Sequence, residues 1–275
     1  MTYLTLFHPI LSKKIDAKIH AIPLRSSWVM TCAYEQMNDQ FVACGGLDNL
    51  CSIYKLNHEG EPINRTHREL AGHDGYLSSC RFIGPEKILT ASGDSSCILW
   101  DIETGSALLK FEGHEQDVMA VHVQAHVNPF TFVSGSCDCS AKVWDTRSGR
   151  CTMTLQGHSN DINAVSLFQD CHTFASGGDD STIRVFDLRS VAEVKCFSSE
   201  SILCGVTSLD VSKSGRFVFG GYDDYNCYKW DVLGSGQKVA QVMSGHENRV
   251  SCVAVNPLGN AVCTGSWDAS LKVWA

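Results

Sequence analysis

The sequence has no excess of basic charge, no long apolar run and no recognisable leader. Its 22 Lys and Arg residues stand against 30 Asp and Glu residues, a formal net charge of -8, so it lacks the basic surface that neutralises nucleic-acid phosphates. No run reaches the 18 apolar residues of a membrane span. Residues 1–11 are partly apolar, but they have no basic flank and contain Pro9, which is not typical of a secretory signal. These absences argue against nucleic-acid binding, a membrane span and secretion.

The 14 cysteines also lack the spacing of a disulfide framework or a metal site. Cys44, Cys97 and Cys252 lie in apolar, strand-like runs, which favours reduced and buried thiols. Cys137 and Cys139 resemble half of a zinc site, but no second pair lies at ligand spacing. The sequence therefore predicts neither a metal nor another cofactor.

What the sequence does contain is a repeat. An aspartate within a turn-like segment recurs six times at intervals of 46, 44, 42, 44 and 44 residues, at Asp48, Asp94, Asp138, Asp180, Asp224 and Asp268. Six residues after each aspartate stands an aromatic residue: Tyr54, Trp100, Trp144, Phe186, Trp230 and Trp274. Asp follows that aromatic residue in four copies, and Gly-His pairs end in His73, His114, His158 and His246. A fixed offset kept six times is a structural repeat.

Each repeat has the pattern of four short antiparallel strands. Residues 131–134 are β-branched and aromatic, 135–138 form a turn, and 141–144 are a second strand-like run. Four strands in about 44 residues is the period of a propeller blade. The sequence predicts an all-β fold, a WD-repeat β-propeller of six four-stranded blades over residues 18–275, and leaves residues 1–17 unassigned.

The recurrent polar residues predict a hydrogen-bonded network inside the blades. Buried polar groups need partners, so the Gly-His imidazole is expected to form hydrogen bonds with the turn aspartate and with a hydroxyl four residues before that aspartate. The same hydroxyl is expected to accept a hydrogen bond from the indole N–H. The predicted members are His73, Thr90, Asp94, Trp100, His114, Ser134, Asp138, Trp144, His158, Ser176, Asp180, His246, Thr264, Asp268 and Trp274. Four copies at one blade position indicate bracing, because catalysis by His, Asp and Ser needs one exposed nucleophile. No enzyme activity is predicted.

Two repeats depart from this pattern. The first has Cys44 in place of the hydroxyl and Tyr54 in place of tryptophan, and the fifth has Gly220 and no Gly-His pair. We expect weaker bracing in those two blades.

Loop residues at two places in each repeat are candidates for contacts with a partner. The first place comprises the residues three and five positions after the Gly-His histidine, and the second is the residue just before the turn aspartate. Tight turns normally take Gly, Asn, Asp or Ser, so Leu47 and Trp267 have no local reason to precede a turn. They are either exposed anchors of an interface or side chains packed on a neighbouring blade.

Residues 18–275 resemble the beta subunit of heterotrimeric G proteins. The stretches that carry the resemblance are residues 20–34, 43–49, 99–105, 221–227 and 245–252. The resemblance implies a seven-bladed propeller whose N-terminal helix coils with a gamma subunit. Met1–Ala17 has no heptad pattern and contains Pro9, so the chain is identified as an N-terminally truncated form in which gamma binding is doubtful.

The truncation leaves two arrangements open. In the first, Lys18–Leu24 joins the last blade as a fourth strand and closes a six-bladed propeller, which would cover an apolar edge. In the second, the chain is a gapped propeller of the seven-bladed type that lacks its first blade. We expect the first arrangement.

The resemblance also implies a non-enzymatic signalling scaffold for G-protein-coupled receptor signalling. Its partners would be a G-protein alpha subunit, effectors or both. Matched residue by residue, the implied partner-binding residues are Trp28, Met30, Leu47, Tyr76, Asp117, Met119, Cys137, Asp161, Asn163, Asp179 and Trp267. The expected location is the cytoplasm, with attachment to the inner face of the plasma membrane through partners. The alternatives are a regulatory decoy that does not bind gamma and a WD-repeat adaptor for an unrelated partner.

Overall fold

The computed structural model describes residues 2–7, 18–24, 28–56, 63 and 65–275, and every regular element in them is a β-strand. The chain divides into two compact units, residues 1–110 and 111–275. Six antiparallel sheets of blade type follow one another along the chain, five with four strands and one with three. The predicted class, an all-β propeller of six WD-repeat blades, is confirmed.

The first unit contains a two-stranded sheet and two blades. Its two-stranded sheet consists of β1 (Thr2–Phe7) and β2 (Lys18–Leu24). The first blade consists of β3 (Val29–Tyr34), β4 (Phe41–Gly46), β5 (Cys51–Lys55) and β6 (Arg68–Leu70). The second consists of β7 (Leu77–Phe82), β8 (Lys87–Ser92), β9 (Ser96–Asp101) and β10 (Ala107–Glu112), whose last residues pass into the second unit.

The second unit contains four blades. The third blade has β11 (Val118–Val123), β12 (Thr131–Ser136), β13 (Ser140–Asp145) and β14 (Arg150–Gln156). The fourth has β15 (Ile162–Leu167), β16 (Thr173–Gly178), β17 (Ile183–Asp187) and β18 (Ala192–Phe197). The fifth has β19 (Val206–Val211), β20 (Phe217–Tyr222), β21 (Cys227–Asp231) and β22 (Gln241–Met243). The sixth has β23 (Val250–Val255), β24 (Val262–Ser266) and β25 (Leu271–Trp274).

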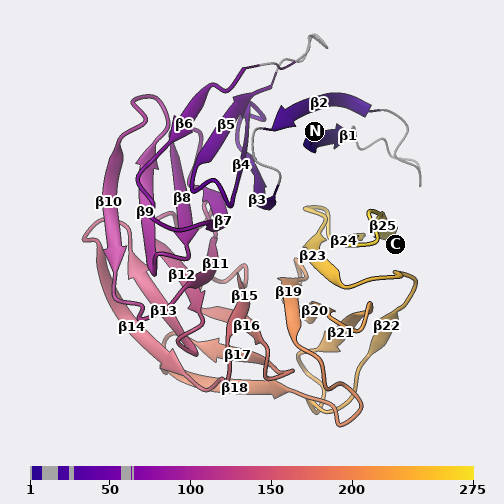
Figure 1. The fold of residues 1–275 in the computed structure, drawn as a ribbon. Helices are drawn as coiled ribbons and strands as arrows, with labels where there is room; N and C mark the ends of the chain where they lie inside the picture. Colours follow the sequence, from indigo (N-terminus) through magenta and orange to yellow (C-terminus); the bar gives the residue numbers. More distant parts are fainter. Residues whose placement is uncertain (1, 8–17, 25–27, 57–62, 64) are drawn as a thin grey trace. The chain divides into compact units, whose positions relative to one another are not determined.

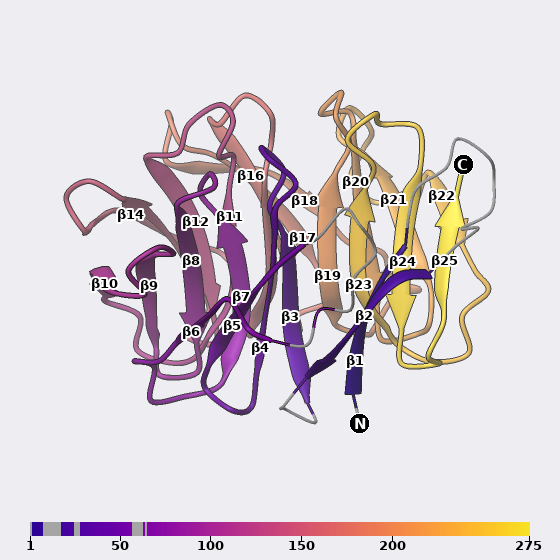
Figure 2. The same cartoon turned by 90° about the horizontal axis from the view of Figure 1, so that it is seen from above.

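Consecutive blades of the second unit pack through their first strands. The first strands β11, β15, β19 and β23 each lie beside the next, and the four blades fan out from them (Figure 1). Seen at right angles, the strands of each blade run up and down, so that the connecting loops gather at the two ends of the blade (Figure 2). Side chains in these loops are therefore held by the blades beneath them.

The second strand of each of the first five blades is almost wholly buried, and in the second unit it is wedged against the first strand of the next blade. All six residues of β4 are buried, as are five of the six in β12, β16 and β20. The wedge leaves no room for a side chain at its narrowest point. A Cβ on Gly135 would lie 2.6 Å from Ile162 Cγ2 of the next blade, and one on Gly177 would lie 2.5 Å from Val206 Cγ1. Glycine at these two positions lets successive blades approach closely.

The last blade has three strands of its own, and Lys18–Leu24 belongs to a separate two-stranded sheet in the first unit. Lys18–Leu24 (β2) pairs with β1, with Thr2 opposite Leu24 and Thr5 opposite Ala21, whereas β23, β24 and β25 form a three-stranded sheet in the described chain. A strand has two hydrogen-bonding edges, and β1 occupies one edge of β2. The pairing of Lys18–Leu24 with the last blade therefore stays a prediction. The segment that we left unassigned thus contains a strand.

The third blade shows the buried polar network in full. His114 Nδ1 lies 2.7 Å from Asp138 Oδ2, and its Nε2 lies 2.7 Å from Ser134 Oγ. Trp144 Nε1–H donates to the same Ser134 oxygen over 2.8 Å. Because Nδ1 faces a carboxylate, we assign the imidazole proton to Nδ1, which leaves Nε2 to accept the serine O–H. Each polar side chain of this network in the third blade thus has a partner.

The same arrangement recurs in three other blades. In the second blade, His73 bonds Asp94 and Thr90 over 2.8 Å each, and Trp100 donates to Thr90 over 2.8 Å. The corresponding sets are His158, Asp180 and Ser176 in the fourth blade and His246, Asp268, Thr264 and Trp274 in the sixth. The fourth blade lacks an indole donor because Phe186 stands at that position.

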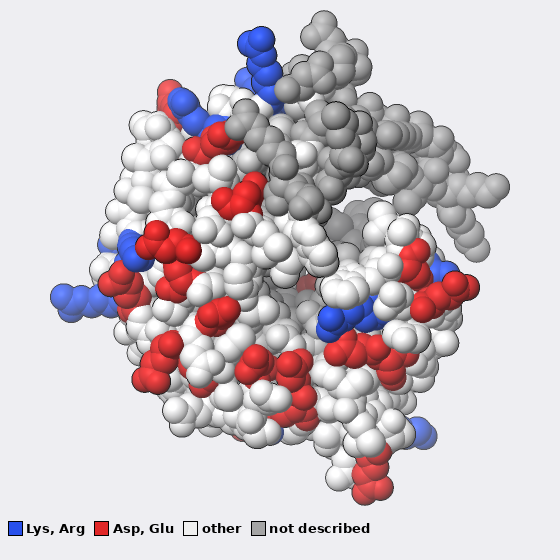
Figure 3. Space-filling view, in the orientation of Figure 1, with Lys and Arg blue, Asp and Glu red and all other residues white. Residues whose placement is uncertain are grey.

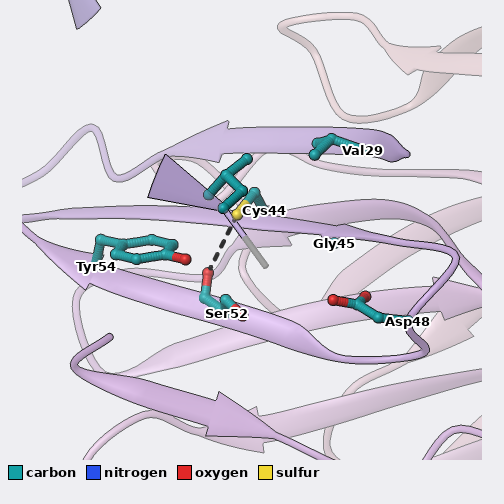
Figure 4. A pocket seen from close by; sticks show the side chains of 7 residues that line it. Val29, Cys44, Gly45, Asp48, Ser52 and Tyr54 are labelled. Carbon is teal, nitrogen blue, oxygen red and sulfur yellow. Dashed lines mark hydrogen bonds between the residues drawn. The ribbon is translucent and has the colours of Figure 1, made fainter. Parts of the chain in front are cut away.

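The two divergent blades replace this network in different ways. In the first blade the Cys44 thiol points toward the carbonyl oxygen of Ser52, 3.8 Å away, beside a pocket that Asp48 and Tyr54 also line (Figure 4). In the fifth blade the Tyr228 hydroxyl donates to the turn aspartate Asp224 over 2.6 Å, where other blades use histidine.

Glycine at position 220 has a steric reason. A Cβ there would lie 2.7 Å from Ile183 Cδ1 and 2.9 Å from Tyr222 Cε2, so the tyrosine ring fills the place of the missing hydroxyl. The Tyr222 hydroxyl and the Trp230 indole nitrogen are buried without a hydrogen-bond partner in the described part of the chain. The fifth blade therefore exchanges polar bracing for aromatic packing.

Removing the shared hydroxyl should destabilise the protein. Ser134→Ala would leave both His114 Nε2 and the Trp144 N–H buried without a partner, so we expect the free energy of unfolding to fall by about 2–3 kcal/mol. Urea denaturation followed by tryptophan fluorescence measures this change. Ser159→Ala, which removes an exposed hydroxyl, is the matched control. Equal stability of the two variants would show that Ser134 does not brace the blade.

The network should also make stability depend on pH. Burial lowers the pKa of His73 and His114 in spite of the neighbouring Asp94 and Asp138. Burial would raise the pKa of those two aspartates, but hydrogen bonds from serine and histidine hold it below its usual value. A histidine with a lowered folded-state pKa contributes its full stability above its unfolded pKa of about 6.5, and that stability is lost as the pH falls below it. The carboxylates add a further loss at pH values below their unfolded pKa of about 3.9.

We therefore expect the free energy of unfolding to decrease between pH 7 and pH 5. His114→Gln should reduce this decrease, because one titrating group is removed from the buried network. His126→Gln changes an exposed histidine and should leave the slope unaltered. Denaturant titrations at several pH values provide the measurement, and a slope in His114→Gln as steep as in the wild type would contradict the assignment.

Candidate functional site

The implied contact residues lie at one end of the hairpin between the first and second strands of each blade. In every blade the residue after the second strand donates its backbone N–H to the carbonyl of the residue before the first strand. These bonded pairs are Leu47 with Trp28, Gly93 with Tyr76, Cys137 with Asp117, Asp179 with Asp161, Asp223 with Gly205, and Trp267 with Arg249, at 2.9–3.2 Å. Eight of the eleven implied residues occupy these twelve positions, which we call the loop-end pairs.

The other three implied residues are the extra residues of β-bulges. In each blade the register of the first hairpin skips one residue near the start of the first strand, at Met30, Ser78, Met119, Asn163, Thr207 and Ser251. A bulged residue has no direct partner across the ladder, and the bulge redirects its side chain. The spacing after Gly-His identified Met119, Asn163 and Ser251, and the resemblance implied Met30, but nothing in the sequence indicated the bulge.

The turn that carries each loop-end pair is held in a constrained backbone conformation. The residue after each turn aspartate has a φ between 61° and 72°, although none is glycine: Asn49, Ser95, Cys139, Ser181, Tyr225 and Ala269. The left-handed region is costly for residues with a Cβ, so surrounding contacts must impose it. The turn aspartate supplies those contacts, since Asp138 Oδ1 accepts bonds from both the backbone N–H and the hydroxyl of Ser140.

In the first unit the site residues are mainly exposed apolar side chains. Trp28 is 59% exposed and Leu47 54%, and they are joined as a loop-end pair. Met30 is exposed as well. Exposed large apolar groups that lie together are characteristic of a protein-binding surface. The Leu47 side chain is thus exposed and not packed into a blade, and its role as an interface anchor stays a prediction.

In the second unit carboxylates surround a thiol. Burial, a hydrogen bond with Asp161, and the charges of Asp117 and Asp179 together raise the pKa of Cys137 to about 12, so this thiol is neutral at physiological pH. Asn163 donates to Asp179 over 2.6 Å and to the carbonyl of Val206 in the next blade over 3.0 Å. Figure 3 shows carboxylate side chains gathered over the region of β16 and β17. This part of the site is acidic.

The sixth blade contributes Trp267, whose side chain is 58% exposed. The Arg249 guanidinium lies over its indole ring, 4.7 Å from the ring centroid, and also pairs with Asp223 over 2.5 Å. Sequence reasoning placed Arg249 and Asp223 at recurrent loop positions but not among the site residues. Spacing within a repeat cannot show which side chains of neighbouring blades meet.

The arrangement provides surfaces for contact. The four imidazoles of the network are buried and hydrogen-bonded on both ring nitrogens. Among the described residues, no group of three His, Cys, Asp or Glu side chains could hold a metal ion. The described part of the chain likewise contains no helix long and apolar enough to cross a membrane.

The fold and the repeated loop-end pairs define a WD-repeat β-propeller that presents side chains on rigid turns. Comparison with known proteins narrows this class. The family model described as G protein beta WD-40 repeat protein matches residues 10–275. The chain therefore belongs to the G-protein beta family of WD-repeat proteins.

Individual relatives agree with this assignment. The guanine nucleotide-binding protein subunit beta of Lymnaea stagnalis is 55% identical over 257 residues, which are 94% of this chain and 74% of that protein. The subunit beta of Dictyostelium discoideum is 53% identical, with 94% and 73% covered. Subunit beta-5b of Danio rerio is 50% identical, with 94% and 65% covered. Members of this family are non-enzymatic signalling proteins, and this chain is a non-enzymatic scaffold of G-protein signalling.

The position of the Tyr76 ring depends on the glycine with which Tyr76 is paired. A Cβ on Gly93 would lie 2.4 Å from Tyr76 Cε1, whereas one on Gly75 would lie 2.6 Å from the backbone nitrogen of Asp94. Gly93→Ala should therefore displace the ring at little cost in stability, because a side chain can move. Gly75→Ala should destabilise the protein by about 1–3 kcal/mol, because the backbone cannot move as easily.

Ring-proton chemical shifts of Tyr76 and denaturant unfolding of both variants test this difference. An unchanged Tyr76 signal in Gly93→Ala, or equal stability of the two variants, would contradict the described packing.

Proposed function

We propose that the chain binds a nucleotide-switched G-protein alpha subunit, effector proteins or both through its loop-end pairs and bulged residues. The observation that carries the proposal is the sixfold backbone hydrogen bond, which holds eight of the eleven implied contact residues in one structural position. The relatives are named as beta subunits of guanine nucleotide-binding proteins, which supports an alpha subunit as the partner.

The chemistry of the positions suits a large protein partner. Trp28, Leu47 and Trp267 are each more than half exposed, and burying such anchors drives association. Asp117, Asp161 and Asp179 add negative charge, which selects a partner with complementary basic groups and accelerates the encounter. The turns carry constrained backbone, so little conformational entropy is lost when a partner binds.

The proposed activity needs no cofactor and no chemical step. Its place of action is the cytoplasm, and its partners would bring it to the inner face of the plasma membrane.

Removing the two tryptophan anchors should weaken binding strongly. A buried tryptophan hot spot contributes about 2–4 kcal/mol, so Trp28→Ala and Trp267→Ala should each raise the Kd for an alpha subunit by more than about tenfold. Calorimetry or biolayer interferometry with the alpha subunit loaded with GDP, and then with a GTP analogue, measures both variants in both nucleotide states.

Leu233→Ala is the control, since it truncates an exposed apolar side chain after β21 and outside the loop-end pairs. It should bind as the wild type does. Binding of both tryptophan variants at wild-type affinity would remove the loop-end pairs from consideration as the interface.

A further inference from the structure

Two charged residues from two blades hold the Trp267 indole. Arg249 precedes β23 in the sixth blade, and its guanidinium carbon lies 4.7 Å from the centroid of the indole ring. The same guanidinium pairs with Asp223 Oδ1 over 2.5 Å, and Asp223 follows β20 in the fifth blade. A cation over an indole face is attracted by the negative face of the ring. The carboxylate thus fixes the cation, and the cation fixes the ring.

The backbone around the three residues is itself fixed. Trp267 N–H donates to the Arg249 carbonyl over 3.1 Å, and Asp223 N–H donates to the Gly205 carbonyl over 3.2 Å. The Asn248 side chain also accepts the Arg249 N–H over 2.8 Å. The side chains of Arg249 and Trp267 are in turn restrained by the ion pair and by the ring contact.

The ion pair is poorly placed to stabilise the fold. The Arg249 and Asp223 side chains are 37% and 36% exposed, and solvent screening at such partly exposed positions limits what an ion pair contributes to folding stability, although the Asp223 Oδ1 atom itself is buried. Of the six loop-end pairs, Arg249 with Trp267 is the one that joins a cation to an aromatic ring. An interaction that restrains an exposed tryptophan on a fixed turn points to a role in recognition.

We infer that Asp223 and Arg249 are positioning residues, which hold the Trp267 indole in the orientation in which it contacts a protein partner. Asp223 acts through Arg249 in this arrangement and does not need to touch the partner. The inference rests on the proposed function for the nature of the partner. Orienting the ring in the free protein lowers the entropy lost when the partner immobilises it, so loss of the restraint should weaken binding severalfold.

The first experiment examines the ring without any partner. Fluorine NMR of the full chain labelled with 5-fluorotryptophan, assigned through Trp267→Phe, reports the environment of the indole. Asp223→Ala should shift or broaden the Trp267 resonance, and Arg249→Lys should retain part of the wild-type signal because it keeps a cation. Asp231→Ala is the control, because it breaks another ion pair of the fifth blade, that with Arg216, and should leave the resonance unchanged. A wild-type resonance in Asp223→Ala would overturn the inference.

A charge exchange separates the ion pair from the contact with the ring. In the double variant Asp223→Arg with Arg249→Asp, opposite charges still face each other, but no cation remains at position 249. The Trp267 resonance should stay displaced. Its return to the wild-type position would show that the ion pair alone, and not the cation over the ring, determines the orientation.

The second experiment measures binding to a purified alpha subunit. Asp223→Ala should raise the Kd about 3–10-fold in the wild-type background, a coupling typical of residues in contact, and less than about twofold when Trp267 is already alanine. Equal effects in both backgrounds would show that Asp223 touches the partner directly and would overturn the inference. If the wild-type chain does not bind the alpha subunit, the proposed function fails, and the fluorine resonance still decides whether Asp223 and Arg249 position the ring.

Discussion

The geometry of the site depends on the hydrogen bonds that the turn aspartate accepts. In the third blade, Asp138 Oδ2 accepts bonds from His114 Nδ1 and from the backbone N–H of Glu115, while its Oδ1 accepts two bonds from Ser140. One carboxylate thus joins the loop that enters a blade to the turn between its second and third strands. These bonds are partly buried, so water competes with them little. They hold the backbone on both sides of Cys139, the residue with left-handed φ that follows the aspartate.

Rigidity at that turn determines what the chain can do. The loop-end pair lies directly beside the turn, so anchors such as Leu47 and Trp267 protrude from fixed backbone instead of packing into the blades. A surface of this kind cannot close around a small substrate, but it can bind a large partner with little loss of conformational entropy. The buried, fully bonded His and Asp residues of the network thus brace the turns from which these side chains protrude.

Much of the fold and part of the site could be predicted from local spacing. The six-residue interval from Asp138 to Trp144 set the second and third strands, and the Gly-His pairs located the buried imidazoles. The bulge at Met119 could not be predicted, because it depends on strand register. Neither could the replacement of histidine by Tyr228 in the fifth blade or the pairing of β2 with β1, since each depends on which groups compete for a partner in space.

The sequence by itself determined the fold class, the number of repeats, the residues of the hydrogen-bonded network and the loop positions beside each Gly-His pair and turn aspartate. All of these are encoded at short and regular intervals. Only the tertiary structure decided which side chains meet across blades. Asp223 and Arg249 are 26 residues apart in the chain and belong to different repeats. Their ion pair, which holds the guanidinium over the Trp267 ring, therefore arises from the packing of one blade on the next. Contacts between repeats depend on how the blades are stacked, and no interval within a repeat contains that information.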